Sequence, residues 1–168
     1  EVEYDRLNYL RTPLNPVRYY DKDGSVYFTN MVGEYNGSLF AYFKVQDDHL
    51  IYRDREALSV NRSDFLQITM LSQDGFEITR YVIAPYGPEP IYPFRVERDY
   101  SNPVYEGRIT GQWYEVDGGY EVELQIPMQM LGDRLGFAVF DVDDPVERSI
   151  STVVATYKVA DAERLGSL

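Results

Sequence analysis

The sequence predicts an all-β protein: an antiparallel β-sandwich, jelly-roll or immunoglobulin-like, with about nine strands and only short helical turns. Apolar and polar residues alternate with a period of two in several segments, as expected for strands with one buried face. Turn signals separate these segments, and Asn36-Gly37 and Asp74-Gly75 are residue pairs that favour tight hairpins. The chain also has 16 Tyr against one Trp and one His, and aromatic residues favour strands.

The segment 118–144 is the clearest element. Gly118-Gly119 marks a turn, and apolar residues then alternate with polar ones over 120–126. Pro127 starts a short helical turn, where its missing N–H costs nothing. A second apolar run follows at 136–140. We expect these two strands to supply core residues, namely Tyr120, Val122, Leu124, Ile126, Phe137 and Val139.

The other segments follow from similar local signals. The segment 1–24 is polar, contains Pro13 and Pro16, and is expected to be irregular. The segment 47–61 is a polar loop. The Pro-rich segment 84–93 is not a central strand, because proline lacks the N–H that a sheet ladder needs. One-sided apolar patterning predicts strands at 25–31 and 39–46, and apolar content predicts one at 64–71. Hairpin turns predict 76–84 as the partner of 64–71 and 109–116 as the partner of 120–126, and Thr and Val predict a strand at 151–157. The segment 94–96 is a candidate short strand.

The composition limits the classes of function. With 168 residues, 44% of them hydrophobic, the chain suits a single domain, 1–168, with one core. It begins at Glu1 without a targeting pattern, and we interpret it as a piece cut from a longer protein. The net charge of −12 argues against nucleic acid and anionic membrane surfaces as partners. The chain has no cysteine for a thiolate metal site. Its lone His49 provides no histidine-based triad, so we expect no catalysis.

Aspartates gather at the ends of two predicted strands. Asp47 and Asp48 follow one strand, and Asp141, Asp143 and Asp144 follow another. Asp141 and Asp143 are two residues apart, so their carboxylates would share a face of the strand. Oxygen ligands of this kind suit Ca²⁺, and we expect calcium as the cofactor if the two groups converge. The spacing does not match an EF-hand loop, and solvated aspartates in turns are the alternative.

Three stretches resemble a known family: SLFAYFKVQDDHLIYRD (38–54), SDFLQITM (63–70) and GGYEVELQIPMQMLGDRLGFAVFDVDDP (118–145). They are similar to the carbohydrate-binding-module-9-like, DOMON-related β-sandwiches. Among these, they look most like the domain that serves as the extracytoplasmic sensor of bacterial histidine kinases. Relatives in this fold carry structural calcium. None of the stretches is a catalytic signature, so the resemblance implies more about fold than about ligand.

The resemblance also implies a ligand surface on one sheet. Gln67 and Arg80 fall where sugar-binding relatives place polar groups that contact the ligand, and an Arg can hold a carboxylate or hydroxyls bidentately. Ordinary wet-face residues with cross-strand partners are the alternative. The two Trp rings that clamp the sugar in those relatives correspond to Asn61 and Val159 here, which argues against simple sugars. Tyrosines would then supply the stacking surface, the candidates being Tyr42, Tyr52, Tyr81 and Tyr157.

We therefore predict a periplasmic, extracytoplasmic ligand-sensing domain of an inner-membrane sensor histidine kinase, with the kinase chemistry elsewhere in the parent protein. Membrane helices would flank the domain, and a homodimer is one expected arrangement. Its partner would be a small polar or anionic ligand, or an envelope protein. Two alternatives remain: a carbohydrate-binding module of a secreted enzyme, and a structural domain that dimerises or docks another envelope protein. Membrane helices flanking this segment in the full gene would separate the first two readings.

Overall fold

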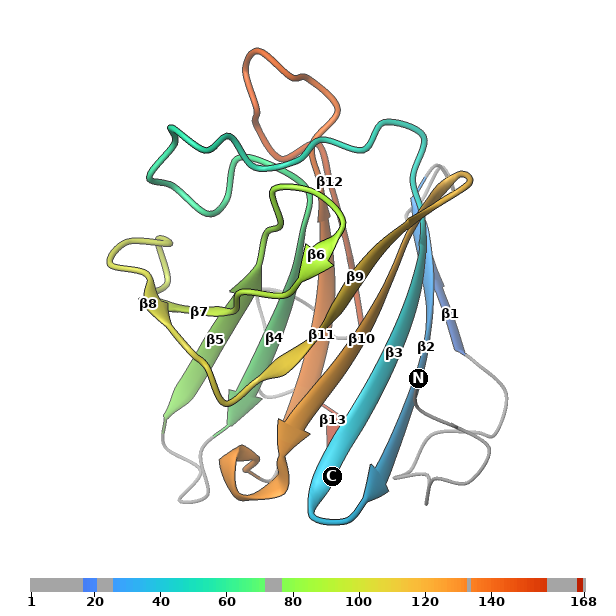
Figure 1. Cartoon of the computed structure of the whole chain (residues 1–168), viewed down its shortest axis with the longest axis vertical. Coiled ribbons are helices and arrows are strands. Elements are labelled where there is room, and N and C mark those ends of the chain that lie inside the picture. Colours follow the sequence, from blue (N-terminus) through green and yellow to red (C-terminus); the bar gives the residue numbers. More distant parts are fainter. Residues whose placement is uncertain (1–16, 21–25, 72–76, 133, 157–165, 168) are drawn as a thin grey trace.

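The computed structural model describes residues 17–20, 26–71, 77–132, 134–156 and 166–167. They form two antiparallel sheets that face each other, so the predicted β-sandwich is confirmed (Figure 1). The six-stranded sheet comprises, in order, β1 (Val17–Tyr20), β2 (Tyr27–Tyr35), β3 (Ser38–Gln46), β10 (Gly119–Pro127), β9 (Thr110–Val116) and β6 (Glu89–Pro90). The seven-stranded sheet comprises β12 (Thr152–Ala155), β11 (Arg134–Asp141), β4 (Phe65–Leu71), β5 (Ile78–Ile83), β7 (Phe94–Val96) and β8 (Val104–Tyr105), with β13 (Gly166–Ser167) paired to β11.

The differences from the prediction lie in short strands. The expectation that 1–24 is irregular is wrong for 17–20, because β1 pairs with β2 and obtains its ladder hydrogen bonds from that neighbour. Strand β6 lies within the Pro-rich segment, at the edge of its sheet, where Pro90 does not interrupt a central ladder. The predicted short turn after Pro127 is a 3₁₀ helix at Met128–Met130.

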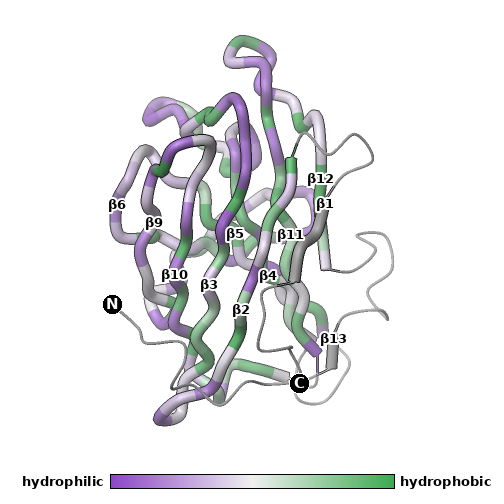
Figure 2. The backbone as a smooth tube through the Cα atoms, turned by 90° about the vertical axis from the view of Figure 1, so that its right-hand side faces the viewer, coloured by the Kyte–Doolittle hydropathy of each residue, from purple (hydrophilic) through white to green (hydrophobic). Residues whose placement is uncertain are grey.

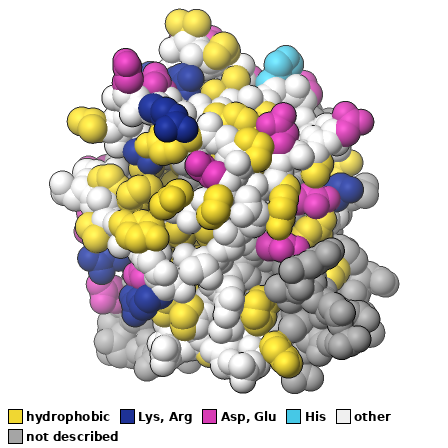
Figure 3. All heavy atoms as spheres, viewed as in Figure 1, with side chains coloured by type: hydrophobic (Ala, Val, Ile, Leu, Met, Phe, Trp, Pro, Cys, Tyr) yellow, Lys and Arg dark blue, Asp and Glu magenta, His cyan; other side chains and the backbone are white. Residues whose placement is uncertain are grey.

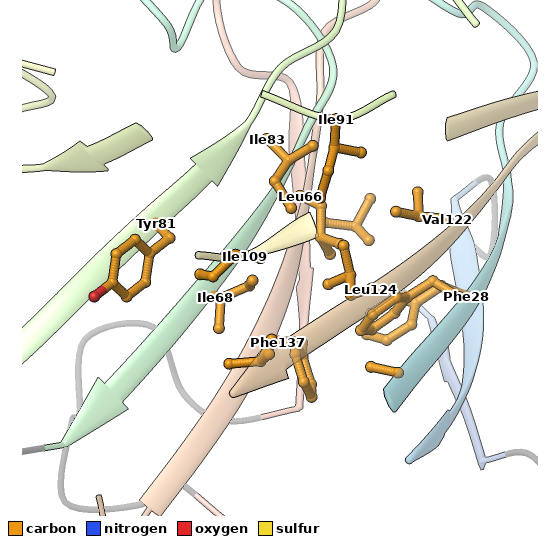
Figure 4. Close-up of a cluster of buried hydrophobic side chains, with 14 of the residues drawn as sticks. Phe28, Leu66, Ile68, Tyr81, Ile83, Ile91, Ile109, Val122, Leu124 and Phe137 are labelled. Atoms are coloured by element: carbon orange, nitrogen blue, oxygen red, sulfur yellow. The ribbon is translucent and has the colours of Figure 1, made fainter. Parts of the chain in front are cut away.

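The main core lies between the sheets. Tyr120, Val122, Leu124 and Ile126 are all buried, as the alternation in 120–126 predicts. Figure 4 shows Leu124, from the six-stranded sheet, pointing into a cluster that Leu66 and Phe137 of the other sheet complete. In Figure 2 the strands carry much of the hydrophobic colouring, and the loops at the upper end are mostly hydrophilic.

The outer face of the seven-stranded sheet carries a second, smaller apolar cluster. Cross-strand pairing aligns one row of residues across this face, in the order Ala155, Ala138, Gln67, Val82, Phe94 and Tyr105. Next to the row, Phe65 and Phe140 stack with ring centroids 4.3 Å apart. Tyr100 lies edge-on to Phe65, at 5.6 Å, so a loop covers part of this face.

Candidate functional site

Three buried aspartates meet at the upper end of the sandwich in Figure 1. Asp47 follows β3, Asp64 precedes β4, and Asp141 ends β11. Their side chains are 4%, 1% and 2% exposed, and one carboxylate oxygen of each lies within 4.8 Å of the others. We call these three residues the buried aspartate triad. The triad therefore joins the ends of two neighbouring strands of the seven-stranded sheet, β4 and β11, to the end of β3 in the six-stranded sheet.

Protein donors satisfy only part of the triad. Asp64 accepts the backbone N–H of Ile51 through Oδ2 at 2.6 Å and that of Val142 through Oδ1 at 2.8 Å. Asp141 Oδ2 accepts the Ser151 hydroxyl at 3.0 Å, whereas Asp141 Oδ1 is buried without a hydrogen-bond donor among the described residues. Since a buried polar atom without a partner costs free energy, the triad has an acceptor that a bound cation could satisfy.

Burial and mutual repulsion raise the pKa of each carboxyl in the triad. Burial is the main cause for Asp64, and with the nearby charges of Asp47 and Asp141 it raises the pKa of Asp64 to about 8. Burial, then the Asp47 charge, raises the pKa of Asp141 to about 7. The pKa of Asp47 is also raised, mainly by burial. Three carboxylates so close are therefore stable near neutral pH only with protons or a cation between them.

A buried tyrosine adds to this arrangement. Tyr120 is fully buried, and its hydroxyl has no hydrogen-bond partner among the described residues. Burial raises its pKa well above the usual value, and the charges of Asp64, Asp47 and Asp141 raise the pKa further. The ring stacks on Trp113, with centroids 3.9 Å apart. The phenol therefore stays neutral near the triad and offers another oxygen there.

The residues present fit a calcium ion. Ca²⁺ prefers several hard oxygen ligands and tolerates irregular geometry. The triad supplies carboxylate oxygens from three separate segments, and its charge and buried unpaired oxygen are the features that a divalent cation would compensate. Asp47, Asp64 and Asp141 would hold the ion.

The predicted metal ligands divide into three groups. Asp47 and Asp141 converge, as the sequence led us to expect. Asp48 and Asp143 lie in a separate, exposed group with His49, whose Nδ1 is 3.3 Å from Asp48 Oδ2. Asp144 belongs to neither group: its Oδ1 accepts the N–H of Val146 and of Glu147, which is the bonding of a turn-forming aspartate.

Asp64 is the member of the triad that was not predicted from the sequence. The position of Asp64 just before a strand was visible in the sequence, whereas the pairing of Phe65 with Phe140, the neighbour of Asp141, is seen only in the structure. Antiparallel pairing of these two strands places the residue before one beside the end of the other. The pairing of 64–71 with 136–140 was not predicted, and without it Asp64 looked like an ordinary strand start.

A surface groove adjoins the triad. It has a volume of about 540 Å³ and contains four carboxylate side chains, those of Asp47, Asp48, Glu115 and Asp117. Glu115 accepts the Tyr52 hydroxyl at 2.6 Å. Such a lining repels anionic ligands and attracts cations. An anionic ligand is therefore expected elsewhere on the molecule.

The predicted ligand-binding residues do not all share one surface. Gln67 and Arg80 both face outward from the seven-stranded sheet. Tyr81 follows Arg80 on β5 and therefore points the other way, into the main core, where it is 6% exposed. Asn61 lies in the loop before β4 and accepts the Ser59 hydroxyl. Tyr157 lies outside the described residues, as does Val159.

Tyr100 occupies the surface at Gln67. Gln67 is 2% exposed, and its Oε1 accepts the Tyr100 hydroxyl at 2.9 Å. Arg80 is half-buried, and none of the described residues gives it an ion-pair partner. Of the two predicted polar groups, Arg80 is thus the one that remains available to a ligand.

Comparison with solved structures identifies the architecture. The chain matches a family 9 carbohydrate-binding module from Caldicellulosiruptor kristjanssonii, solved in complex with glucose. The two share 13% identity, and the match covers 98% of this chain and 83% of the other, with a TM-score of 0.58. The fold is CBM9-like. No family model and no curated protein sequence matches the chain.

The resemblance inferred from the sequence is therefore confirmed at the level of the fold. Segments 38–54, 63–70 and 118–145, which carry the resemblance, contain β3, β4, β10 and β11. These are neighbouring strands at the centres of the two sheets. The CBM9-like pattern in the sequence thus corresponds to the structural centre of the domain.

Proposed function

We propose that this domain is a non-catalytic saccharide-recognition module. The observation that carries the proposal is the likeness, over 98% of the chain, to a carbohydrate-binding module that holds glucose. The ligand would bind on the outer face of the seven-stranded sheet, near Arg80. An arginine held by a rigid strand can donate paired hydrogen bonds to hydroxyl or carboxylate oxygens.

Calcium would have a structural role in this proposal. The buried aspartate triad ties the loop after β3 to the ends of β4 and β11. An ion bound there would fix the loop 47–64, which also carries residues on the outer face, such as Val60. Because the ion would bind only the folded state, it would stabilise the domain.

The single histidine supports the non-catalytic part of the proposal. The His49 side chain is 66% exposed and lies beside Asp48 on the surface. A hydrolytic triad needs a histidine held between a nucleophile and an acid, in a site that excludes water. His49 has the acid neighbour but not the enclosed position.

Two parent proteins are compatible with such a module. The sensor domain of a histidine kinase remains our prediction from the sequence motifs, with a periplasmic location. A carbohydrate-binding module of a secreted enzyme fits the fold likeness at least as well. None of the described residues forms a helix long and apolar enough to cross a membrane. The full gene separates the two: membrane helices on both sides of the segment would support the sensor, and a glycoside hydrolase domain would support the module.

Isothermal titration calorimetry with a panel of neutral and acidic oligosaccharides tests the proposed function. We expect weak binding of at least one saccharide, and loss of that binding in Arg80→Ala. Arg108→Ala is the matched control, because the Arg108 guanidinium is exposed and engaged by Glu106 at 2.8 Å and 2.9 Å. Binding that Arg80→Ala leaves unchanged would move the site away from Arg80, and no binding across the panel would remove the proposal.

A further inference from the structure

Arg53 lies against two aromatic rings at the outer face of the seven-stranded sheet. Its guanidinium carbon is 5.1 Å from the centroid of Tyr86 and 5.3 Å from that of Phe94. The Arg53 backbone N–H donates to the carbonyl of Pro85 at 3.0 Å, which holds the loop against the segment that follows β5. Contacts with two rings restrict the guanidinium, so its position is set before any ligand arrives.

The charge of Arg53 has no counter-charge in the described part of the chain. Its Nε is buried without an acceptor, and no described residue forms an ion pair or a side-chain hydrogen bond with it. Two other arginines of these loops are engaged by contrast: Arg62 donates to the carbonyl of Glu147, and Arg148 donates to those of Tyr52 and Arg62. An unpaired, half-buried cation is unusual in a chain with a net charge of −12.

Two acidic residues, Asp54 next to Arg53 in the chain and Glu89 close to the stacked Tyr86, are engaged elsewhere. The Asp54 carboxylate accepts the N–H of Glu56 at 2.9 Å, and the Glu89 carboxylate accepts the N–H of Tyr86 at 2.8 Å. Both stabilise local turns. The Arg53 guanidinium can therefore bind an anion that comes from outside the described part of the chain.

Exposed aromatic rings extend the surface beside Arg53. Tyr105 lies 6.2 Å from Phe94 and 6.1 Å from Tyr92, measured between ring centroids. Tyr105 is 57% exposed and Tyr92 53% exposed. Arg55 adds a second cation, 5.2 Å from the Tyr86 centroid. Figure 3 shows hydrophobic side chains gathered where β7 and β8 lie in Figure 1, with basic side chains next to them.

We infer that Arg53, together with Tyr92 and Tyr105, binds a saccharide that carries a carboxylate, such as a uronic acid residue. The inference rests on the proposed saccharide recognition and names the class of saccharide. The guanidinium fork matches a carboxylate, and a tyrosine ring offers an apolar face to a sugar ring and a hydroxyl to its edge. A neutral sugar would leave Arg53 without a counter-charge. An acidic saccharide would be repelled from the carboxylate-lined groove beside the triad, which favours its binding at Arg53 instead.

The test compares trigalacturonate with the same trimer after methyl esterification, by calorimetry at fixed calcium concentration. We expect the acidic trimer to bind roughly tenfold tighter or more, as for hydrogen bonds to a charged group. Arg53→Gln should reduce its affinity to that of the ester, and Arg53→Lys should fall in between, because lysine keeps the charge and loses the fork. Tyr105→Ala should weaken both trimers. Arg108→Gln, on an arginine already paired with Glu106, should change neither.

A second measurement needs no variant. Phenylglyoxal modifies accessible arginines, and mass spectrometry gives the extent of modification at each one. Trigalacturonate should protect Arg53, whereas the methyl ester should protect it less. Equal affinity for the two trimers would overturn the selectivity for acidic saccharides, and no protection of Arg53 would overturn the binding of the carboxylate to Arg53. Either result would leave the proposed function standing. Failure of every saccharide, neutral or acidic, to bind would overturn both.

Discussion

Asp64 and Asp141 are 77 positions apart in the sequence, but their carboxylates lie together at one end of the sandwich. One carboxylate oxygen of each lies within 4.8 Å of the other and of an Asp47 carboxylate oxygen. Asp64 precedes β4 and Asp141 ends β11, and these strands are antiparallel neighbours. Asp64 also accepts the N–H of Val142 at 2.8 Å, which joins the start of β4 to the exit of β11. Any change that alters the charge of this pair should therefore affect the stability of the whole sandwich.

Calcium should raise the melting temperature of the domain in a concentration-dependent way. At about 100 times its dissociation constant, the gain would be about 2.7 kcal/mol for a site present only in the folded state. Differential scanning calorimetry with EDTA and with millimolar calcium measures the change. Asp141→Asn should remove the response, and Asp144→Asn, which changes only a turn, should retain it. Identical melting curves with and without calcium would disprove the metal site.

The metal-free domain should lose stability as the pH rises from about 4 to about 8. A carboxyl has a pKa of about 3.9 when unfolded, whereas burial raises the pKa of Asp64 to about 8 and that of Asp141 to about 7. Between these values the folded state binds more protons than the unfolded chain, so a rise in pH favours unfolding. Urea midpoints of the metal-free protein across this range give the slope. Asp141→Asn should flatten this slope and make the metal-free protein more stable at pH 8. A urea midpoint of the unmodified protein that rises with pH would contradict the proximity of the three carboxyls.

Leu124→Ala should destabilise the fold by about 2–5 kcal/mol, the usual range for truncation of a fully buried leucine. Leu124 is 1% exposed and lies between Ala41 of β3 and Gly111 of β9, where neither small neighbour can fill the space. Chemical denaturation provides the measurement. Gln125→Ala on the exposed face of the same strand is the control, and it should cost far less. Equal losses for the two variants would show that the register of β10 is wrong.

Gly119→Ala should be poorly tolerated, because a Cβ at this position would lie 2.0 Å from the carbonyl oxygen of Val45. The backbone φ of +154° also disfavours a side chain. We expect a loss of at least about 2 kcal/mol, as for an overpacked site. Gly87→Ala is the control, since a Cβ there meets nothing within 4 Å. If both variants melt alike, the hairpin between β9 and β10 differs from the one described.

The sequence predicted the parts of the fold that local patterns determine. Alternation over 120–126 and the Asn36-Gly37 turn identified β10 and the β2–β3 hairpin, because strand period and turn chemistry are local properties. The two-residue strands β6 and β13 pair with β9 and β11, which are distant in sequence. Their residues carry no period of their own, so they could not be predicted locally.

The candidate site was predictable only in part. The period of two could have shown that Arg80 and Tyr81 face opposite sides of β5, and the structure places Tyr81 in the core. The position of Tyr100 on Gln67 depends on a positive φ of 63° in a non-glycine residue, which no local preference predicts. The contacts of Arg53 with Tyr86 and Phe94 join three segments, and they required the full topology.

The most direct test of saccharide recognition is an amide chemical-shift map of the domain, recorded by NMR during titration with an oligosaccharide that binds. We expect shifts to concentrate on β4, β5 and β7, whose outward residues include Gln67, Arg80 and Phe94. Strands β2 and β3 of the opposite sheet should remain unperturbed. Shifts confined to the six-stranded sheet, or the absence of shifts with every saccharide tested, would contradict saccharide binding on the outer face of the seven-stranded sheet.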